Sequence, residues 1–363
     1  MAERKAWLYL EDGTVMEGRG FGGTSRRGGE VVFTTAMNGY PESLTDPSYL
    51  GQILIITHPL VGNYGVPSPK FLNGRLLNFE AEMISVEGLI VSELTEGSNY
   101  EERKSLESWF MESNVPGLSG IDTRELVKKI RDNGVMRGII SQEKLYQPLA
   151  EFASQEPLCL VKKASVSQPI EYAGSRRGNI VIVDLGAKQG IVNCLADTGY
   201  TIVKVPYDSD ENRIMNYDPV GIVYSNGPGN PNELKRQAEE LSKLLERNIP
   251  TLGICLGHQV AVLALGGEVE KMKYGHRAIN KAVLERGSGR SYITTHNHGY
   301  AASGKGIDKS DVWFVSPDDG IIEGLRRGNL MTTQFHPEAR PGPRDTEFVF
   351  GLFEKMIENA RHP

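Results

Sequence analysis

The chain has 363 residues, of which 39% are hydrophobic and 24% are charged, and its formal net charge is −6. This is the composition of an ordinary globular protein, and at roughly 100–200 residues per domain the length favours two domains. Lys and Arg form neither a basic stripe nor a polybasic cluster, which argues against a nucleic-acid partner and against a charged membrane surface.

The three cysteines, Cys159, Cys194 and Cys255, are widely spaced and form no CxxC pair. This pattern fits neither a disulfide framework nor a structural zinc site, so we expect a cytoplasmic protein and no metal centre. The N-terminus has no apolar core of the kind found in signal peptides. The most apolar stretch, 251–267, is too short to span a bilayer and is interpreted as a buried strand and helix.

The first half of the chain is predicted to be β-rich. Short apolar runs bounded by turn residues predict strands at 7–10, around Val15, at 31–35 and at 52–57. Amphipathic spacing predicts helices at 100–113 and from Ile121 to the breaker Asn133-Gly134, the second capped by Asp122 or Thr123. The glycines between 18 and 29 lack the strand–loop–helix setting of a dinucleotide loop and are interpreted as turns. We therefore expect an α+β domain at 1–150, followed by a Pro- and Gly-containing linker at 151–178.

Residues 179–363 change character, because strands and helices now alternate. The predicted strands are 179–184, 201–205, 221–224, 250–254 and 330–335, and the predicted helices are 189–197, 232–247, 257–265 and 345–360. The run NIVIVD at 179–184 is apolar throughout, as a strand covered on both faces must be. This alternation predicts a doubly wound parallel sheet, whose sites lie at the carboxyl ends of its strands, and places the chain in the α/β class.

Cys255 stands between an apolar strand and an apolar helix, in the sequence Gly253-Ile254-Cys255-Leu256-Gly257. This is the cysteine form of a nucleophile elbow, in which glycines permit a sharp strand-to-helix turn. The helix N-terminus directs free N–H groups at the sulfur, which favours the thiolate, and the N–H of Leu256 can donate to an oxyanion. By itself, the pattern leaves open a buried structural cysteine.

A nucleophilic cysteine needs a base and a group that orients the base. His336 follows a predicted strand and is separated from Glu338 by Pro337, so both side chains can lie on one side of the chain. His258 is on the helix that leads away from the elbow and is a weaker candidate. A surface turn would explain the His-Pro-Glu sequence alone, but the order Cys, His, Glu on a parallel α/β domain predicts a catalytic triad.

The second half resembles the class I, triad-type glutamine amidotransferases. The resemblance rests on the segments 225–231 (SNGPGNP), 253–259 (GICLGHQ) and 335–338 (FHPE), which occur in the family's order. The first half is similar to the small subunit of carbamoyl phosphate synthetase. The matching segments are 37–40, 44–49, 59–65, 117–124 and 134–138.

This resemblance implies a role for each matching residue. Cys255 is the nucleophile, His336 the base and Glu338 its orienter. The residues implied to bind glutamine are Ser48, Gly227, Gly229, Leu256, Gln259, Asn297, Gly299 and Tyr300. Ser48 is implied to reach glutamine from the other domain, and a Gly227 amide to complete the oxyanion hole.

The resemblance further implies a glutaminase chain that passes ammonia to a large synthetase subunit, for arginine and pyrimidine biosynthesis. That subunit would use ATP, Mg²⁺ and bicarbonate, since this sequence shows no phosphate-binding loop, and we expect no cofactor on this chain. Two alternatives remain open: a stand-alone cysteine hydrolase of γ-glutamyl compounds, and a non-catalytic regulatory relic.

Overall fold

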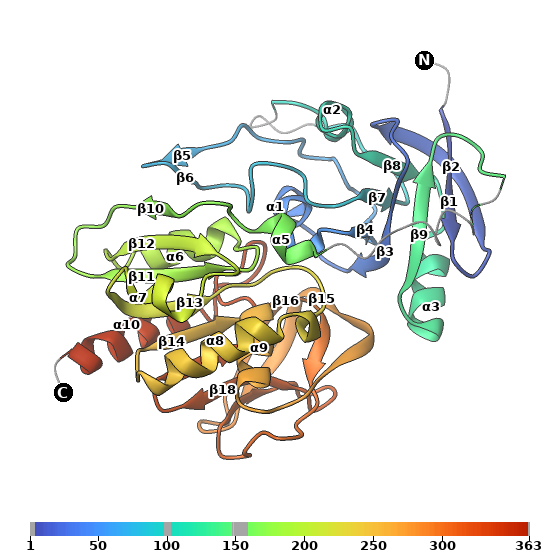
Figure 1. Cartoon of the computed structure of the whole chain (residues 1–363). Helices are drawn as coiled ribbons and strands as arrows, with labels where there is room; N and C mark the ends of the chain where they lie inside the picture. Colours follow the sequence, from blue (N-terminus) through green and yellow to red (C-terminus); the bar gives the residue numbers. More distant parts are fainter. Residues whose placement is uncertain (1–3, 98–102, 147, 149–158, 362–363) are drawn as a thin grey trace. The chain divides into compact units, whose positions relative to one another are not determined.

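The computed structural model describes residues 4–97, 103–146, 148 and 159–361 (Figure 1). The chain divides into two compact units. The first comprises Met1–Lys70 and Asn78–Leu158, and the second comprises Phe71–Leu77 and Cys159–Pro363.

This division differs from the expected linker at 151–178. Residues 151–158 lie outside the described residues, but residues from Cys159 onward belong to the second unit. They include helix α5 (Leu160–Ala164) and strand β10 (Ile170–Tyr172), which pairs antiparallel with the edge of the second unit's sheet. Pro169 and Gly174, two of the residues that suggested a linker, lie on either side of β10, because an edge strand tolerates such residues at its ends.

Seven strands of the first unit close into a barrel, as the β-rich sequence indicates. Their order around the barrel is β1 (Lys5–Leu10), β2 (Val15–Gly22), β8 (Pro116–Ser119), β7 (Gly88–Val91), β4 (Gln52–Ile56), β3 (Arg27–Thr34) and β9 (Met136–Ser141). Gly117 allows close packing inside, because a Cβ there would lie 2.2 Å from the ring of Phe21. A separate two-stranded ribbon, β5 (Phe71–Leu72) and β6 (Arg75–Leu76), belongs to the second unit.

The first unit's helices are short. They are α1 (Tyr40–Thr45), the 3₁₀ helix η1 (Pro47–Tyr49), α2 (Leu106–Glu112) and α3 (Thr123–Asn133). The predicted cap of α3 is confirmed, since the Glu125 N–H donates to Asp122 Oδ1 at 2.9 Å. The predicted helix 100–113 is too long: residues 100–102 lie outside the described residues, and α2 begins only after Ser105, whose hydroxyl accepts from Ser108 N. Helix α2 begins after the N-cap Ser105, and the hydrophobic spacing alone did not indicate this starting point.

The second unit is built on a ten-stranded mixed sheet. The strands, in their order across the sheet, are β10, β12 (Thr201–Pro206), β11 (Asn179–Asp184), β13 (Pro219–Tyr224), β14 (Thr251–Ile254), β19 (Leu330–Thr333), β18 (Ile322–Arg327), β16 (Ser291–Ala302), β15 (Val269–Glu285) and β17 (Val312–Val315). The five strands from β12 to β19 pair in parallel and match the five strands predicted from the sequence.

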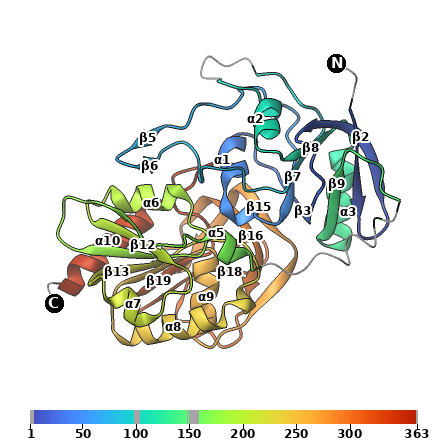
Figure 2. The same cartoon turned by 45° about the horizontal axis from the view of Figure 1, so that its top comes forward.

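Two apolar cores cover the faces of the parallel strands. Ile180 and Ile182 of β11 face the core under α6 (Gln189–Ala196) and α10 (Phe348–Arg361), whereas Val181 and Val183 face the opposite core. The opposite core contains α7 (Glu211–Met215), α8 (Lys235–Glu246) and α9 (Leu256–Ala264). Figure 2 shows α6 and α10 on one side of these strands and α7, α8 and α9 on the other. The continuous apolar run of β11 is therefore a requirement of burial on both faces.

The antiparallel half of the sheet was not predicted from the sequence. Its main feature is the hairpin of β15 and β16, which pairs over most of its length with two interruptions of the register. Buried positions of β16 hold polar residues, including His296, Asn297 and His298, so neither strand shows the alternation that marks a strand in sequence.

Within the described part of the chain, no helix has the length and apolar character needed to cross a membrane.

Candidate active site

The predicted chemistry gathers where the parallel strands of the second unit end. Lys188 follows β11, the 225–229 loop follows β13, Cys255 follows β14 and His336 follows β19. Because all four strands run the same way, their carboxyl ends meet at one edge of the sheet. The pairing of β14 with β19 continues past the last strand residue, where Cys255 N donates to Thr333 O at 2.7 Å.

Cys255 has a backbone conformation that L-residues seldom adopt, with φ 52° and ψ −101°. The two flanking glycines permit it. A Cβ on Gly257 would lie 2.0 Å from Tyr224 O, and a Cβ on Gly253 would lie 2.7 Å from Gly257 O. The sharp turn puts Cys255 at the start of α9, as the elbow pattern predicted.

The sulfur of Cys255 is buried among polar groups. Its thiol donates to Asn297 O at 3.7 Å, and Gln334 Nε2 approaches the sulfur at 3.7 Å. Gln334 is itself held by Gln259, whose Nε2 donates to Gln334 Oε1 at 3.0 Å and to Tyr300 O at 2.8 Å. Gln334 was missed in the sequence because it lies inside the predicted strand 330–335, where no motif singles it out.

His336 and Glu338, predicted as base and orienter, are in direct contact. His336 Nδ1 lies 2.6 Å from Glu338 Oε1, and both side chains are almost completely buried. Nε2 of His336 has no hydrogen-bond partner among the described residues, so it remains available to a reacting group. Burial lowers the pKa of His336, but the Glu338 carboxylate and Cys255 outweigh burial and raise that pKa to about 10. A protonated His336 carries a positive charge and a proton beside Cys255.

Lys188 is a further member of the site that the sequence analysis missed. Its side chain is 1% exposed, and its Nζ lies 3.0 Å from Glu338 Oε1 and donates to the carbonyls of Ala339 and Arg340 at 2.8 Å. Burial favours neutral Glu338, yet Lys188 and His336 hold its pKa at about 2. The sequence could have pointed to Lys188, because this residue follows the carboxyl end of a predicted buried strand, where sites of such sheets lie.

His258 does not belong to the triad. Its Nδ1 is 2.8 Å from Thr332 Oγ1, and burial lowers its pKa to about 3, so the imidazole is neutral. The sequence-based preference for His336 over His258 agrees with this geometry.

The structure places the residues implied to bind glutamine in two groups. Gly227, Gly229, Leu256, Gln259, Asn297, Gly299 and Tyr300 belong to the second unit. Ser48 belongs to the first unit, where it is buried in η1 and its N–H donates to Asp46 Oδ1. Its implied contact with glutamine therefore stays a prediction.

Gly227 is packed so tightly that only glycine fits. A Cβ there would lie 1.9 Å from Leu185 O and 3.0 Å from Leu256 Cδ2. The backbone of Gly227 is thus next to Leu256, the first residue of α9. Backbone amides next to a reacting thiol can hold a developing oxyanion, which is the role implied for Gly227 and Leu256.

These contacts can support acyl transfer from an amide to a thiol. The nucleophile lies at a helix N-terminus, the base is oriented by a carboxylate, and the carboxylate is held by a buried ammonium. A separate group of metal-binding residue types, His276, His296, His298 and Glu323, lies on the antiparallel half of the sheet.

Comparison with known proteins identifies both halves of the chain. The family described as "Carbamoyl-phosphate synthase small chain, CPSase domain" matches residues 8–140, and "Glutamine amidotransferase class-I" matches residues 181–356. The carbamoyl phosphate synthase small chain of Metallosphaera sedula is 54% identical over 355 residues, covering 96% of this chain and 95% of that protein. The small chains of Sulfurisphaera tokodaii and Sulfolobus acidocaldarius are 53% and 50% identical over 359 and 361 residues, covering 97% of this chain and 96% of each relative. This chain therefore belongs to the carbamoyl phosphate synthase small chain family and carries the class I amidotransferase domain of its glutamine-hydrolysing function.

Proposed function

We propose that Cys255, His336 and Glu338 hydrolyse glutamine to glutamate and ammonia. The observation that carries this proposal is the buried pair of His336 and Glu338, 2.6 Å apart, beside a cysteine at the tip of a strand-to-helix elbow. A buried structural cysteine needs neither the unusual backbone angles nor an oriented imidazole. Strain of this kind persists where the site requires it.

In the proposed reaction, the Cys255 thiolate attacks the side-chain amide carbon of glutamine. The carbonyl oxygen becomes an oxyanion that accepts from the amides of Leu256 and Gly227, each donor contributing roughly 10²–10³-fold in rate. His336 gives its proton to the departing nitrogen, which leaves as ammonia. A water, deprotonated by His336, then attacks the γ-glutamyl thioester and returns the thiolate.

Lys188 and Glu338 keep His336 correctly placed through both steps. The Lys188 ammonium holds the Glu338 carboxylate ionised, and the carboxylate accepts from His336 Nδ1. The other nitrogen, Nε2, then faces the reaction with the proton that ammonia needs. Lys188 acts through Glu338 and is a positioning residue.

The substrate contacts are part of the proposal. Gln259, Asn297, Gly299 and Tyr300 would bind the amino-acid end of glutamine. Gly229, whose φ is +94°, would bring bare backbone to the ligand. Ser48 would contribute from the first unit.

Membership of the small chain family implies a large-subunit partner. We propose that ammonia passes to that subunit, which uses ATP, Mg²⁺ and bicarbonate to make carbamoyl phosphate, and that this chain supplies no cofactor to the reaction. A cytoplasmic location is consistent with the three free thiols Cys159, Cys194 and Cys255.

The test is Cys255→Ser in the complex with the large subunit. We expect glutamine-dependent carbamoyl phosphate synthesis to be lost, because an unassisted hydroxyl is a far weaker nucleophile. Synthesis from added ammonium should continue at the wild-type rate, because the ATP chemistry lies on the partner. The control is Cys159→Ser, an exposed cysteine, which should leave both activities unchanged.

Glutamine hydrolysis that survives Cys255→Ser would refute the proposed nucleophile. Rapid hydrolysis by the isolated chain, unchanged by the large subunit, would instead support a stand-alone hydrolase.

A further inference from the structure

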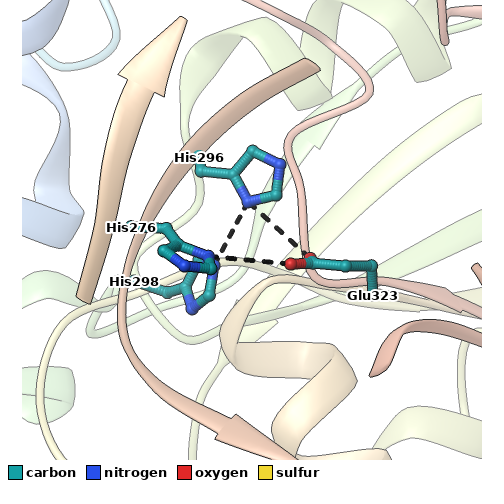
Figure 3. Close-up of side chains that lie close together, drawn as sticks. All are labelled: His276, His296, His298 and Glu323. Atoms are coloured by element: carbon teal, nitrogen blue, oxygen red, sulfur yellow. Dashed lines mark hydrogen bonds and ion pairs between the residues drawn. The ribbon is translucent and has the colours of Figure 1, made fainter. Parts of the chain in front are cut away.

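Three histidines and a glutamate meet inside the antiparallel half of the second unit's sheet (Figure 3). His276 comes from β15, His296 and His298 from β16, and Glu323 from β18. Each offers a ligand atom within 4.8 Å of the others, and all four residues are buried. Only His296 and His298 are close in the chain, and His276 and Glu323 are 47 positions apart (276 to 323), so no compact ligand motif marks this group in the sequence.

The distances between the donor atoms are close to those of a tetrahedral site. His296 Nδ1 is 3.2 Å from His298 Nε2 and 3.7 Å from Glu323 Oε2, and His276 Nδ1 is 3.7 Å from Glu323 Oε1. Zinc bonds of about 2.0–2.1 Å in a tetrahedron separate neighbouring ligand atoms by about 3.3 Å. Small side-chain rotations would therefore close the four donors around one ion.

The contacts of His298 and His296 turn two nitrogen lone pairs toward each other. His298 Nδ1 lies 2.9 Å from the carbonyl of Tyr300, which can only accept, so Nδ1 carries the proton and Nε2 is bare. Thr294 Oγ1 donates to Lys281 O and so accepts from His296 Nε2 at 2.7 Å, which leaves His296 Nδ1 bare.

His276 completes the same pattern. Its Nε2 lies 2.9 Å from the Asp319 carboxylate, which accepts the proton there and leaves Nδ1 toward Glu323. Nδ1 has no hydrogen-bond partner among the described residues. In each histidine, one ring nitrogen is therefore hydrogen-bonded to an oxygen outside the cluster, and the other has no proton and faces the other three residues. Metal-binding histidines are usually held in this way.

Glu323 provides the negative charge at the centre. Its side chain is fully buried, and neither carboxylate oxygen has a hydrogen-bond partner among the described residues. A buried polar atom without a partner is costly, and two on one carboxylate need an explanation.

We propose that His276, His296, His298 and Glu323 form a structural Zn²⁺ site. Three imidazoles and one carboxylate suit zinc better than magnesium or calcium, which prefer all-oxygen ligands. Four protein ligands in a buried position leave no coordination place open for substrate, so the metal does not take part in catalysis.

The zinc site would stabilise strand β16, which contacts Cys255 through Asn297. His298 lies between Asn297, whose carbonyl accepts from the Cys255 thiol, and Gly299. The Tyr300 carbonyl that holds His298 also accepts from Gln259. An ion that joins β15, β16 and β18 would fix this segment next to the proposed glutamine site.

The test measures metal in the full chain, co-expressed with the large subunit and grown with zinc or with cobalt. We expect about one zinc ion per small chain after dialysis, by elemental analysis against a large-subunit blank. The cobalt form should show the strong visible bands of tetrahedral Co²⁺. His296→Gln and Glu323→Gln should each lose the metal, whereas the control His58→Gln, in the first unit, should retain it.

A wild-type chain that holds no zinc would overturn the proposal. Zinc retained equally in His296→Gln and Glu323→Gln would overturn it as well. The cobalt spectrum of the wild type needs no variant, so a folding defect in either substitution leaves the proposal falsifiable. Loss of glutaminase activity in Cys255→Ser bears only on the triad and leaves the zinc content unchanged.

Discussion

Replacing Lys188 by methionine removes a buried positive charge while keeping an unbranched apolar side chain. Lys188 Nζ contacts the Glu338 carboxylate at 3.0 Å and two backbone carbonyls at 2.8 Å, and its side chain is 1% exposed. In Lys188→Met, Glu338 keeps only its bond to His336, and both carbonyls lose a donor. Removing one partner of a buried ion pair costs about 3–5 kcal/mol, so we expect a decrease of that size in the free energy of unfolding.

The same substitution should change the stability at acidic pH. The pKa of Glu338 is lowered from 4.5 to about 2, so its stabilising contribution is present above pH 4.5 and is lost between pH 4.5 and about 2. Lys188 is the largest of the interactions that lower this pKa. Lys188→Met should therefore lose less stability than the wild type as the pH falls through this window.

The assay is urea unfolding of the full chain, followed by its fluorescence at neutral and at acidic pH. The matched control is Lys305→Met, which removes an exposed lysine at 3.0 and 3.4 Å from Glu268 and Glu270. The control should unfold close to the wild-type midpoint, because exposed ion pairs contribute little. A Lys188→Met protein as stable as Lys305→Met, with the wild-type dependence on acid, would refute the role assigned to Lys188.

Two further predictions concern His336 and the elbow. Because the pKa of His336 is raised from 6.5 to about 10, its contribution to stability is present below pH 6.5 and lost as the pH rises to about 10. Urea midpoints across that range should fall more steeply for the wild type than for His336→Gln, and equal slopes would count against the ion pair. Gly257→Ala should unfold the elbow or abolish glutaminase activity, because its Cβ would lie 2.0 Å from Tyr224 O. Gly351→Ala, in open space on helix α10, should stabilise the chain by about 0.5–1 kcal/mol, and thermal unfolding of both variants checks this contrast.

The parallel half of the second unit could be predicted from sequence because each strand carries its own signal. A run such as 179–184 is apolar at every position, since both faces of the strand are covered. The antiparallel hairpin β15–β16 could not be predicted in this way. Its buried positions hold histidines and an asparagine, and only contacts with other strands compensate for burying them.

The positions of Cys255, His336 and Glu338 could be predicted because each residue follows the carboxyl end of a recognisable strand. Gln334 and Lys188 could not, since their roles depend on where distant side chains meet. Gln334 contacts the Cys255 sulfur only because β14 and β19 are neighbours, and Lys188 meets Glu338 across 150 positions of sequence (188 to 338).

The sequence by itself determined the family and the α/β class, and it predicted Cys255 as the nucleophile with His336 and Glu338 as its partners. These conclusions rest on short local patterns, namely glycines at a sharp turn and a His-Pro-Glu run after a strand. The tertiary structure alone decided which charges are buried together: Lys188 with Glu338, and His276, His296 and His298 with Glu323. Which charged groups meet in the interior depends on strand order, which no local pattern in the sequence records.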